Sequence, residues 1–219
     1  MSISGFFAAG GVVMWPLLVF SILAIALILE RIIFWQRVTK RQKPIIREVL
    51  RLYPQDTQTA LQILQRNSDL PIARIFLAAL ELEKPTPEEF RLALESAAQA
   101  EMPILKRFNT GFETIIAVSP LLGLLGTILG LINAFAALRV GDIGTSNTPG
   151  VTGGISEALI STVGGLCVAI FTLLFANSFR GLYRRQLALI QEYGGKLELL
   201  YRRYYPYERF PYVTAHKPE

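Results

Sequence analysis

Residues 114–138 of the chain read TIIAVSPLLGLLGTILGLINAFAAL and contain no charged side chain. A second such stretch, 143–179, is interrupted only by Glu157, and a third covers residues 1–29. A helix needs roughly 20 residues to cross a hydrocarbon core of about 30 Å. Helices buried in soluble proteins rarely run this long without a charge. Residues 1–29 also lack the basic N-terminal region of a cleaved signal peptide. The sequence therefore predicts three transmembrane helices.

The composition agrees with a membrane protein. The 219 residues are 52% apolar and 18% charged, with a mean hydropathy of +0.39, whereas soluble domains carry about 25% charged residues. A disordered chain would be less hydrophobic, and a disulfide framework would need more than the single Cys167. Both classes are excluded. The net charge of +5 does not indicate nucleic-acid binding, because basic residues are excluded from the apolar stretches.

The distribution of basic residues predicts the orientation. Residues 31–111 hold 13 Lys and Arg residues and residues 180–219 hold eight, while the N-terminal tip and the 140–153 loop hold none. Basic loops stay in the cytoplasm. The N-terminus is therefore expected outside and the C-terminus inside. The predicted fold class is an all-α integral membrane protein with three transmembrane helices and long helical extensions into the cytoplasm.

Six segments follow from this topology. They are an outer tip with the first transmembrane helix (1–37), a cytoplasmic helical domain (38–111), the second transmembrane helix (112–139), a short outer loop (140–152), the third transmembrane helix (153–179), and a cytoplasmic C-terminal helix with a tail (180–219).

Apolar periodicity and breakers predict several helices in the cytoplasmic segment. One helix is expected to stop at Pro54, a second to close at residues 67–69, and a third to open at Pro71. The sequence TPEE at 86–89 predicts a further helix, with Thr as N-cap, Pro at the first helical position and Glu three residues after the cap. No clear stop signal follows before Gly141, so this helix is expected to continue into the second transmembrane span.

The chain contains few of the residue types that catalytic and metal sites use. The chain has one His, His216 near its end, and one Cys, so neither a catalytic triad nor a zinc cluster can be assembled. No phosphate-binding loop is present, because GGK at 194–196 is followed by Leu. We expect no enzyme activity, no metal and no cofactor.

Glu157 is the candidate functional residue. An acid near the centre of a transmembrane helix costs about 2.5–3.5 kcal/mol and usually marks an ion or proton route. The alternative is an ordinary hydrated acid near the outer membrane surface. Small and polar residues on the same helical face favour the first interpretation: Gly154, Ser161 and Gly165 recur with Glu157 at spacings of three and four, and Thr162 borders them.

The second span has a matching face. Gly123, Gly126, Thr127 and Gly130 lie on it, with Asn133 adjacent. Such faces either pack closely against another helix or line a pathway. Close packing alone explains the glycines well, but it explains poorly why Thr127, Thr162 and Glu157 occur together.

Three motifs resemble those of the ExbB/TolQ/MotA proton-channel family. The N-terminal GGVVMWPLLVFSILAIALILERIIFW resembles its first span, and SPLLGLLGTILGLINAF and GGISEALISTVGGLCVAI resemble its second and third spans. The topology is more similar to ExbB and TolQ than to the four-span flagellar subunit. By residue-to-residue match, the resemblance implies that protons pass by Glu157, Thr127 and Thr162.

The resemblance also implies a complex. It predicts a homo-pentamer in the bacterial inner membrane, with outward parts in the periplasm, surrounding an ExbD- or TolR-like single-span partner. The proton motive force would then energise a TonB-like protein for outer-membrane transport, or a TolA-like protein in a TolQ-like motor for envelope maintenance. The basic residues Lys106, Arg107 and Arg180 are candidate contacts for an acidic partner segment, although solvated surface residues are the alternative.

Two other classes of protein remain as hypotheses. A non-conducting membrane scaffold would hold partner helices and tolerate replacement of Glu157 by Gln. A small-molecule transporter is disfavoured, because three spans offer no inverted repeat and no pair of broken helices.

Overall fold

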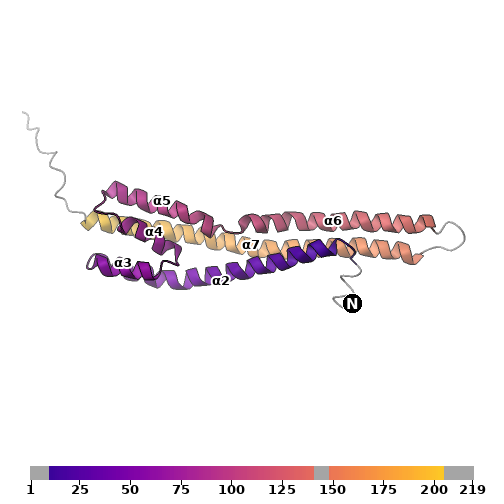
Figure 1. Ribbon diagram of the computed structural model, residues 1–219, viewed down its shortest axis with the longest axis horizontal. Coiled ribbons are helices and arrows are strands. Elements are labelled where there is room, and N and C mark those ends of the chain that lie inside the picture. Colours follow the sequence, from indigo (N-terminus) through magenta and orange to yellow (C-terminus); the bar gives the residue numbers. More distant parts are fainter. Residues whose placement is uncertain (1–9, 141–147, 205–219) are drawn as a thin grey trace, which may run out of the picture. The chain divides into compact units, whose positions relative to one another are not determined.

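The computed structural model describes residues 10–140 and 148–204 of the chain. Over these residues the ordered secondary structure is entirely helical (Figure 1). The helices are α2 (Met14–Leu52), α3 (Thr57–Arg66), α4 (Pro71–Leu80), α5 (Pro87–Leu105), α6 (Asn109–Val140) and α7 (Thr148–Tyr204). The all-α prediction is confirmed for the described part.

The chain divides into two compact units. One comprises Met1–Phe34 and Lys106–Leu182, and the other comprises Trp35–Leu105 and Tyr183–Glu219. We call them the apolar unit and the polar unit. Both α2 and α7 contribute to each unit, because each is a single long helix that starts in the apolar unit and ends in the polar one.

The apolar unit consists of the first part of α2, all of α6 and the first two thirds of α7. Here α6 and α7 run antiparallel and side by side (Figure 1). Large apolar side chains such as Leu124, Phe135 and Leu174 are exposed on the unit's surface. Three helical stretches, Met14–Leu52, Pro87–Leu138 and Pro149–Tyr204, are long and apolar enough to cross a membrane, and less than a third of their most apolar parts is buried within the chain. The unit thus suits an apolar surrounding.

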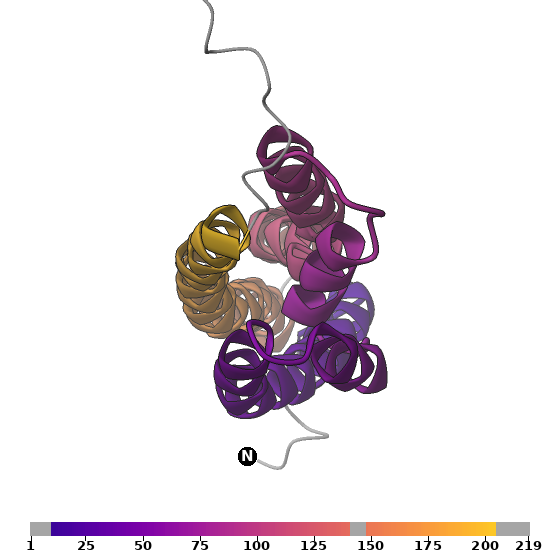
Figure 2. The same cartoon turned by 90° about the vertical axis from the view of Figure 1, so that its left-hand side faces the viewer.

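The polar unit has a core of its own around α4. This helix packs against α3 and α5, and it can be followed in the end-on view (Figure 2). Its residues Ile72, Ala73, Ile75, Phe76 and Ala79 are at most 1% exposed. The apolar face is therefore buried, as its spacing in the sequence predicts.

Polar contacts also fix this unit. The buried amides of Gln42 and Gln186 donate to each other's oxygens at 2.7 and 2.8 Å, which joins α2 to α7. Arg74 of α4 binds the buried carboxylate of Glu101 on α5 through two hydrogen bonds of 2.6 and 2.5 Å. Since unpaired buried polar groups are costly, these pairs favour the observed register between the helices they join.

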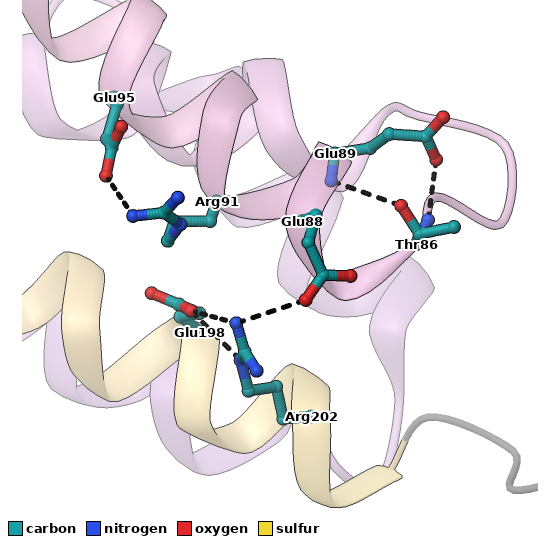
Figure 3. A network of polar contacts seen from close by, with 7 residues as sticks. All are labelled: Thr86, Glu88, Glu89, Arg91, Glu95, Glu198 and Arg202. Atoms are coloured by element: carbon teal, nitrogen blue, oxygen red, sulfur yellow. Dashed lines mark hydrogen bonds and ion pairs between the residues drawn. The ribbon is translucent and has the colours of Figure 1, made fainter.

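The start of α5 has the predicted capping geometry. The Thr86 backbone N–H donates to the Glu89 carboxylate at 2.7 Å, and the Glu89 N–H donates to the Thr86 hydroxyl at 3.2 Å (Figure 3). The same view shows Arg202 near the end of α7, which bonds Glu198 at 3.0 Å and forms an ion pair with Glu88 at 3.7 Å. The reciprocal bonds satisfy two backbone N–H donors at the helix start.

One expectation about this helix is wrong. The helix that begins after Thr86 does not continue into the second span, because α5 ends at Leu105 and α6 begins at Asn109 after a turn at 106–108. Phe108 in that turn has φ +68°, a left-handed conformation that a helix cannot include. Its carbonyl accepts the N–H of Phe112 at 3.0 Å and so starts α6. Pro103 lies inside α5 and Pro120 lies inside α6.

Candidate functional site

The Glu157 carboxyl lies in the apolar unit, where three segments meet. Glu157 is half-buried on α7, and Asn133 of α6 donates its Nδ2 to Oε2 at 3.4 Å. The same carboxyl lies against the backbone of Gly11, just before α2 begins. Glu157 is thus bordered by α6 on one side and by the start of α2 on another.

The glycine-rich faces form the contact between α6 and α7 within one chain. A Cβ built on Gly130 would lie 2.6 Å from the Gly154 carbonyl oxygen, and a Cβ built on Gly154 would lie 2.6 Å from the Gly130 carbonyl oxygen. A Cβ on Gly126 would overlap the side chain of Ser161. The residues predicted for helix packing or a pore face all lie in this contact: Gly123, Gly126, Gly130, Gly154, Ser161 and Gly165. The two backbones approach closely because these positions are small.

The two threonine hydroxyls are bonded to helix carbonyls. Thr162 Oγ1 lies 3.2 Å from the carbonyl oxygens of both Gly123 and Ala158, so it links α7 to α6. Thr127 Oγ1 donates to the Leu124 carbonyl at 2.6 Å. Both side chains are half-buried. Their hydroxyl oxygens keep lone pairs that can accept a further hydrogen bond.

The single chain does not gather all three predicted proton-pathway residues at one point. With about 100° of rotation per helical residue, Glu157 and Thr162 project about 140° apart on α7, and Asn133 and Thr127 about 120° apart on α6. Asn133 contacts Glu157 on one flank of the α6–α7 contact. The two threonines therefore lie on the other flank.

The candidate partner contacts are partly engaged within the chain. Arg180 bonds Glu113 at 2.9 Å, joining α7 to α6. The Arg107 guanidinium lies 4.7 Å from the centre of the Phe108 ring, and Lys106 belongs to the same turn between α5 and α6. Arg180 is accordingly an ion-paired surface residue in this structure.

Sequence reasoning gave no functional role to three residues that the structure places beside charged groups; Asn133 is exposed, Gly11 is half-buried and Arg31 is buried. Asn133 contacts Glu157, and Gly11 lies against it. Arg31 is 2% exposed, bonds Glu30 at 2.7 Å, and lies 4.2 Å from the centre of the Phe34 ring. The only signal for Arg31 was its place at the end of the first apolar stretch, which does not distinguish a buried cation from a hydrated one.

Known proteins are similar to this chain over most of its length. Residues 67–192, more than half of the chain, match the MotA/TolQ/ExbB proton channel family. "Putative biopolymer transport protein ExbB-like 3" of Synechocystis sp. is 62% identical over 94% of this chain and 99% of its own length. "Putative biopolymer transport protein ExbB-like 1" of the same organism is 42% identical over 94% of this chain and 82% of its own length.

A more distant similarity concerns part of the chain. "Biopolymer transport protein ExbB" of Salmonella typhimurium is 38% identical over 41% of this chain and 35% of its own length. The extended similarity to the ExbB-like proteins agrees with the three apolar helical stretches and the motifs that carry the resemblance. The chain is a multi-pass membrane protein that belongs to the MotA/TolQ/ExbB proton channel family.

Proposed function

We propose that this chain is the proton-conducting subunit of an ExbB-like energy-transducing motor in a bacterial inner membrane. The observation that carries the proposal is the Glu157 carboxyl, which lies inside the apolar unit between Asn133 and the start of α2. A carboxyl in a membrane-spanning helix usually serves ions or protons, because its insertion is otherwise unfavourable. Thr127 and Thr162 are proposed to position water or the carboxyl, since hydroxyls both donate and accept.

The route requires more than one copy of the chain. One chain places Glu157 and the two threonines on different flanks of its α6–α7 contact. In a ring of identical copies, different surfaces of neighbouring subunits meet. Residues that one chain separates can then face a common space. The exposed apolar side chains of the apolar unit supply surface for such contacts and for lipid, and family resemblance favours five copies.

The proposed partner is a single-span protein resembling ExbD or TolR, whose helix occupies the centre of the ring. Moving one charge across 100 mV is worth about 2.3 kcal/mol. A few protons passing Glu157 supply enough free energy to move the partner relative to the ring. That motion is transmitted to a TonB-like protein, and the names of the relatives as biopolymer transport proteins support this branch over a TolQ-like one.

The proposed orientation follows from the basic residues. The polar unit carries most of the Lys and Arg residues and is placed in the cytoplasm, with the N-terminus and the 140–152 loop in the periplasm. The segments 38–111 and 180–219 then form the cytoplasmic part, and 1–37, 112–139 and 153–179 contain the spans.

A complementation experiment tests this function against a scaffold. A strain that lacks the gene is scored under iron limitation and under detergent stress, which report on outer-membrane uptake and on envelope integrity. Wild-type chain and Glu192→Gln, a change at an exposed acid paired with Lys196, are expected to complement. Glu157→Gln is expected to assemble normally but not to complement, because an amide cannot exchange a proton. Full complementation by Glu157→Gln would favour the scaffold.

A further inference from the structure

Gly11 occupies a position that only glycine fits, and the reason is Glu157. Gly11 has φ +71°, a conformation that other residues adopt with strain. A Cβ built on it would overlap Oε1 of Glu157 and would lie 2.5 Å from Cδ and 2.9 Å from Cγ of the same side chain. The carboxyl of α7 therefore fills the space that a side chain at position 11 would need.

The turn that contains Gly11 is fixed to the rest of the apolar unit. Val13, Met14 and Leu17 are 5%, 4% and 3% exposed and pack together with Leu122 of α6. The first turn of α2 is closed by hydrogen bonds from Met14 N–H to the Gly11 carbonyl at 3.2 Å and from Trp15 N–H to the Val12 carbonyl at 3.3 Å. The contact between Gly11 and Glu157 is thus part of a packed arrangement.

Charge supports the same arrangement. The positive end of a helix dipole lies at the start of the helix. α2 has no acidic residue in its first turn. Glu157 of α7 brings a carboxylate to this end of α2 from another part of the chain.

We propose that the turn Gly10–Val13 is a wall of the Glu157 site, in addition to Asn133, and that Gly11 is the positioning residue that leaves room for the carboxyl. A role of this wall in proton transfer rests on the proposed function. The contact between Gly11 and the Glu157 carboxyl does not depend on that function, so an experiment can reject either one without the other.

A cysteine pair tests the proximity. In full-length chain with Cys167→Ser, Gly11→Cys is combined with Glu157→Cys in membrane vesicles and oxidised. Disulfides need Cβ atoms about 3.5–4.5 Å apart. The built Cβ of residue 11 lies 2.9 Å from Glu157 Cγ. Because Cγ is one bond from the Cβ of residue 157, the two Cβ atoms are close enough for a disulfide. The matched control combines Gly11→Cys with Leu159→Cys, whose native side chain is 63% exposed on α7. We expect a disulfide in the first pair and none in the control. Equal yields in both pairs would overturn the proposal.

A second measurement reports on the carboxyl itself. An apolar carbodiimide is added to vesicles containing full-length chain, and modification of Glu157 is followed by mass spectrometry. Gly11→Ala is expected to push the carboxyl outward and to raise the initial rate by about fivefold or more. Gly153→Ala, where an added Cβ meets nothing within 4 Å, is expected to leave the rate unchanged. An unchanged rate of modification in folded Gly11→Ala would overturn the proposal. This outcome is independent of the proton flux through Glu157→Gln, which tests the proposed function.

A rescue separates positioning from a general loss of structure. Glu157→Asp shortens the side chain by one methylene and relieves the overlap with Ala at position 11. The double variant is expected to react at the rate of Glu157→Asp alone. If Gly11→Ala acted only through backbone strain, the shorter acid would not restore the rate, and the positioning role would be rejected.

Discussion

At the scale of single residues, the structure shows how an acid is accommodated in an apolar helix. Glu157 would cost about 2.5–3.5 kcal/mol near a helix centre in lipid. The chain offsets this cost with the Asn133 amide at 3.4 Å and with the positive end of α2 beside Gly11. Half-burial leaves one side of the side chain accessible. A carboxyl that is half-buried but accessible from one side suits the proposed role of Glu157 in taking up and releasing protons.

The threonine hydroxyls are predicted to matter in a graded way. Thr162→Val removes the bonds to the Gly123 and Ala158 carbonyls while keeping the shape, and Thr162→Ser keeps the hydroxyl. Proton flux in vesicles is expected to fall by about tenfold for Val, roughly one such bond, and by much less for Ser. Thr127 should follow the same order. If Val and Ser variants conducted equally at both positions, the hydroxyls would be packing residues only.

A pH dependence is predicted at the start of α5. Hydrogen bonds from the Thr86 backbone and hydroxyl hold the pKa of Glu89 below its ordinary value of 4.5. A lowered pKa in the folded state stabilises this end above about pH 4.5, and the contribution is lost as the pH falls through the lowered value. Thr86→Ala is therefore expected to speed amide hydrogen exchange in the first turn of α5 at neutral pH.

The pH dependence of the Thr86→Ala effect serves as a control for the role of Glu89. As the pH falls through the lowered pKa of Glu89, the difference between Thr86→Ala and wild type is expected to shrink, because the Glu89 carboxylate is neutralised in both. A difference that stayed constant down to low pH would assign the effect to the hydroxyl alone.

The sequence predicts contacts between residues that are near each other in the chain, but not contacts that depend on how distant helices pack. The capping residues Thr86 and Glu89 are three positions apart, and their spacing alone predicts both hydrogen bonds. Gly11 and Glu157 are far apart in the chain, and their contact depends on how α2 packs on α7. A glycine in an N-terminal turn gives no sign that another side chain fills its Cβ position.

At the scale of helices, small residues let α6 and α7 pack backbone against backbone. Small residues at spacings of three and four predicted a packing face on each span, and the structure joins the two faces to each other within one chain. The pattern could not indicate whether the partner helix belonged to the same chain or to another copy. Only the paired contacts, such as that of Gly130 with Gly154, decide this.

Replacement of a contact glycine is predicted to disrupt the fold of the apolar unit. Gly130→Leu would drive a side chain into the backbone of Gly154 and Ala158 on α7. We expect a large loss of folded protein in detergent, measured by size-exclusion chromatography and thermal unfolding. Gly153→Leu is the matched control on α7, because an added Cβ there meets nothing within 4 Å. Equal behaviour of the two variants would place Gly130 outside the contact.

The break between α5 and α6 shows what helix signals in a sequence cannot reveal. Residues 106–108 contain no glycine or proline, so local preferences predict a continuous helix. The structure instead places Phe108 in a left-handed conformation, with the Arg107 and Arg31 guanidiniums 4.7 and 5.6 Å from its ring centre. Contacts formed on folding outweigh local preference at this turn.

At the scale of the whole molecule, the chain combines an apolar unit and a polar unit joined by continuous helices. The apolar stretches and the helix pattern of residues 38–111 predicted both kinds of segment, because hydropathy and periodicity are local properties. Orientation, the number of copies and the partner depend on other molecules and on the membrane. For these the sequence supplies only the asymmetry of basic residues and the family resemblance.

The topology is predicted to be N-out and C-in. Single cysteines in a Cys167→Ser background are labelled with a membrane-impermeant maleimide in intact spheroplasts. A cysteine at Ser146 is expected to react from outside, and one at Gln62, an exposed position on α3, only after the membrane is opened. Reaction of the Gln62 position in intact spheroplasts would reverse the orientation.

Proton flux into vesicles shows whether protons pass by Glu157. The tagged chain is purified from its native membrane with any single-span protein that accompanies it, and reconstituted into vesicles carrying a pH gradient and a pH-sensitive dye. We predict that wild-type complex and Glu192→Gln dissipate the gradient, while Glu157→Gln complex of the same composition does so only at the rate of empty vesicles. Flux through Glu157→Gln equal to that of wild type would show that Glu157 does not carry the protons.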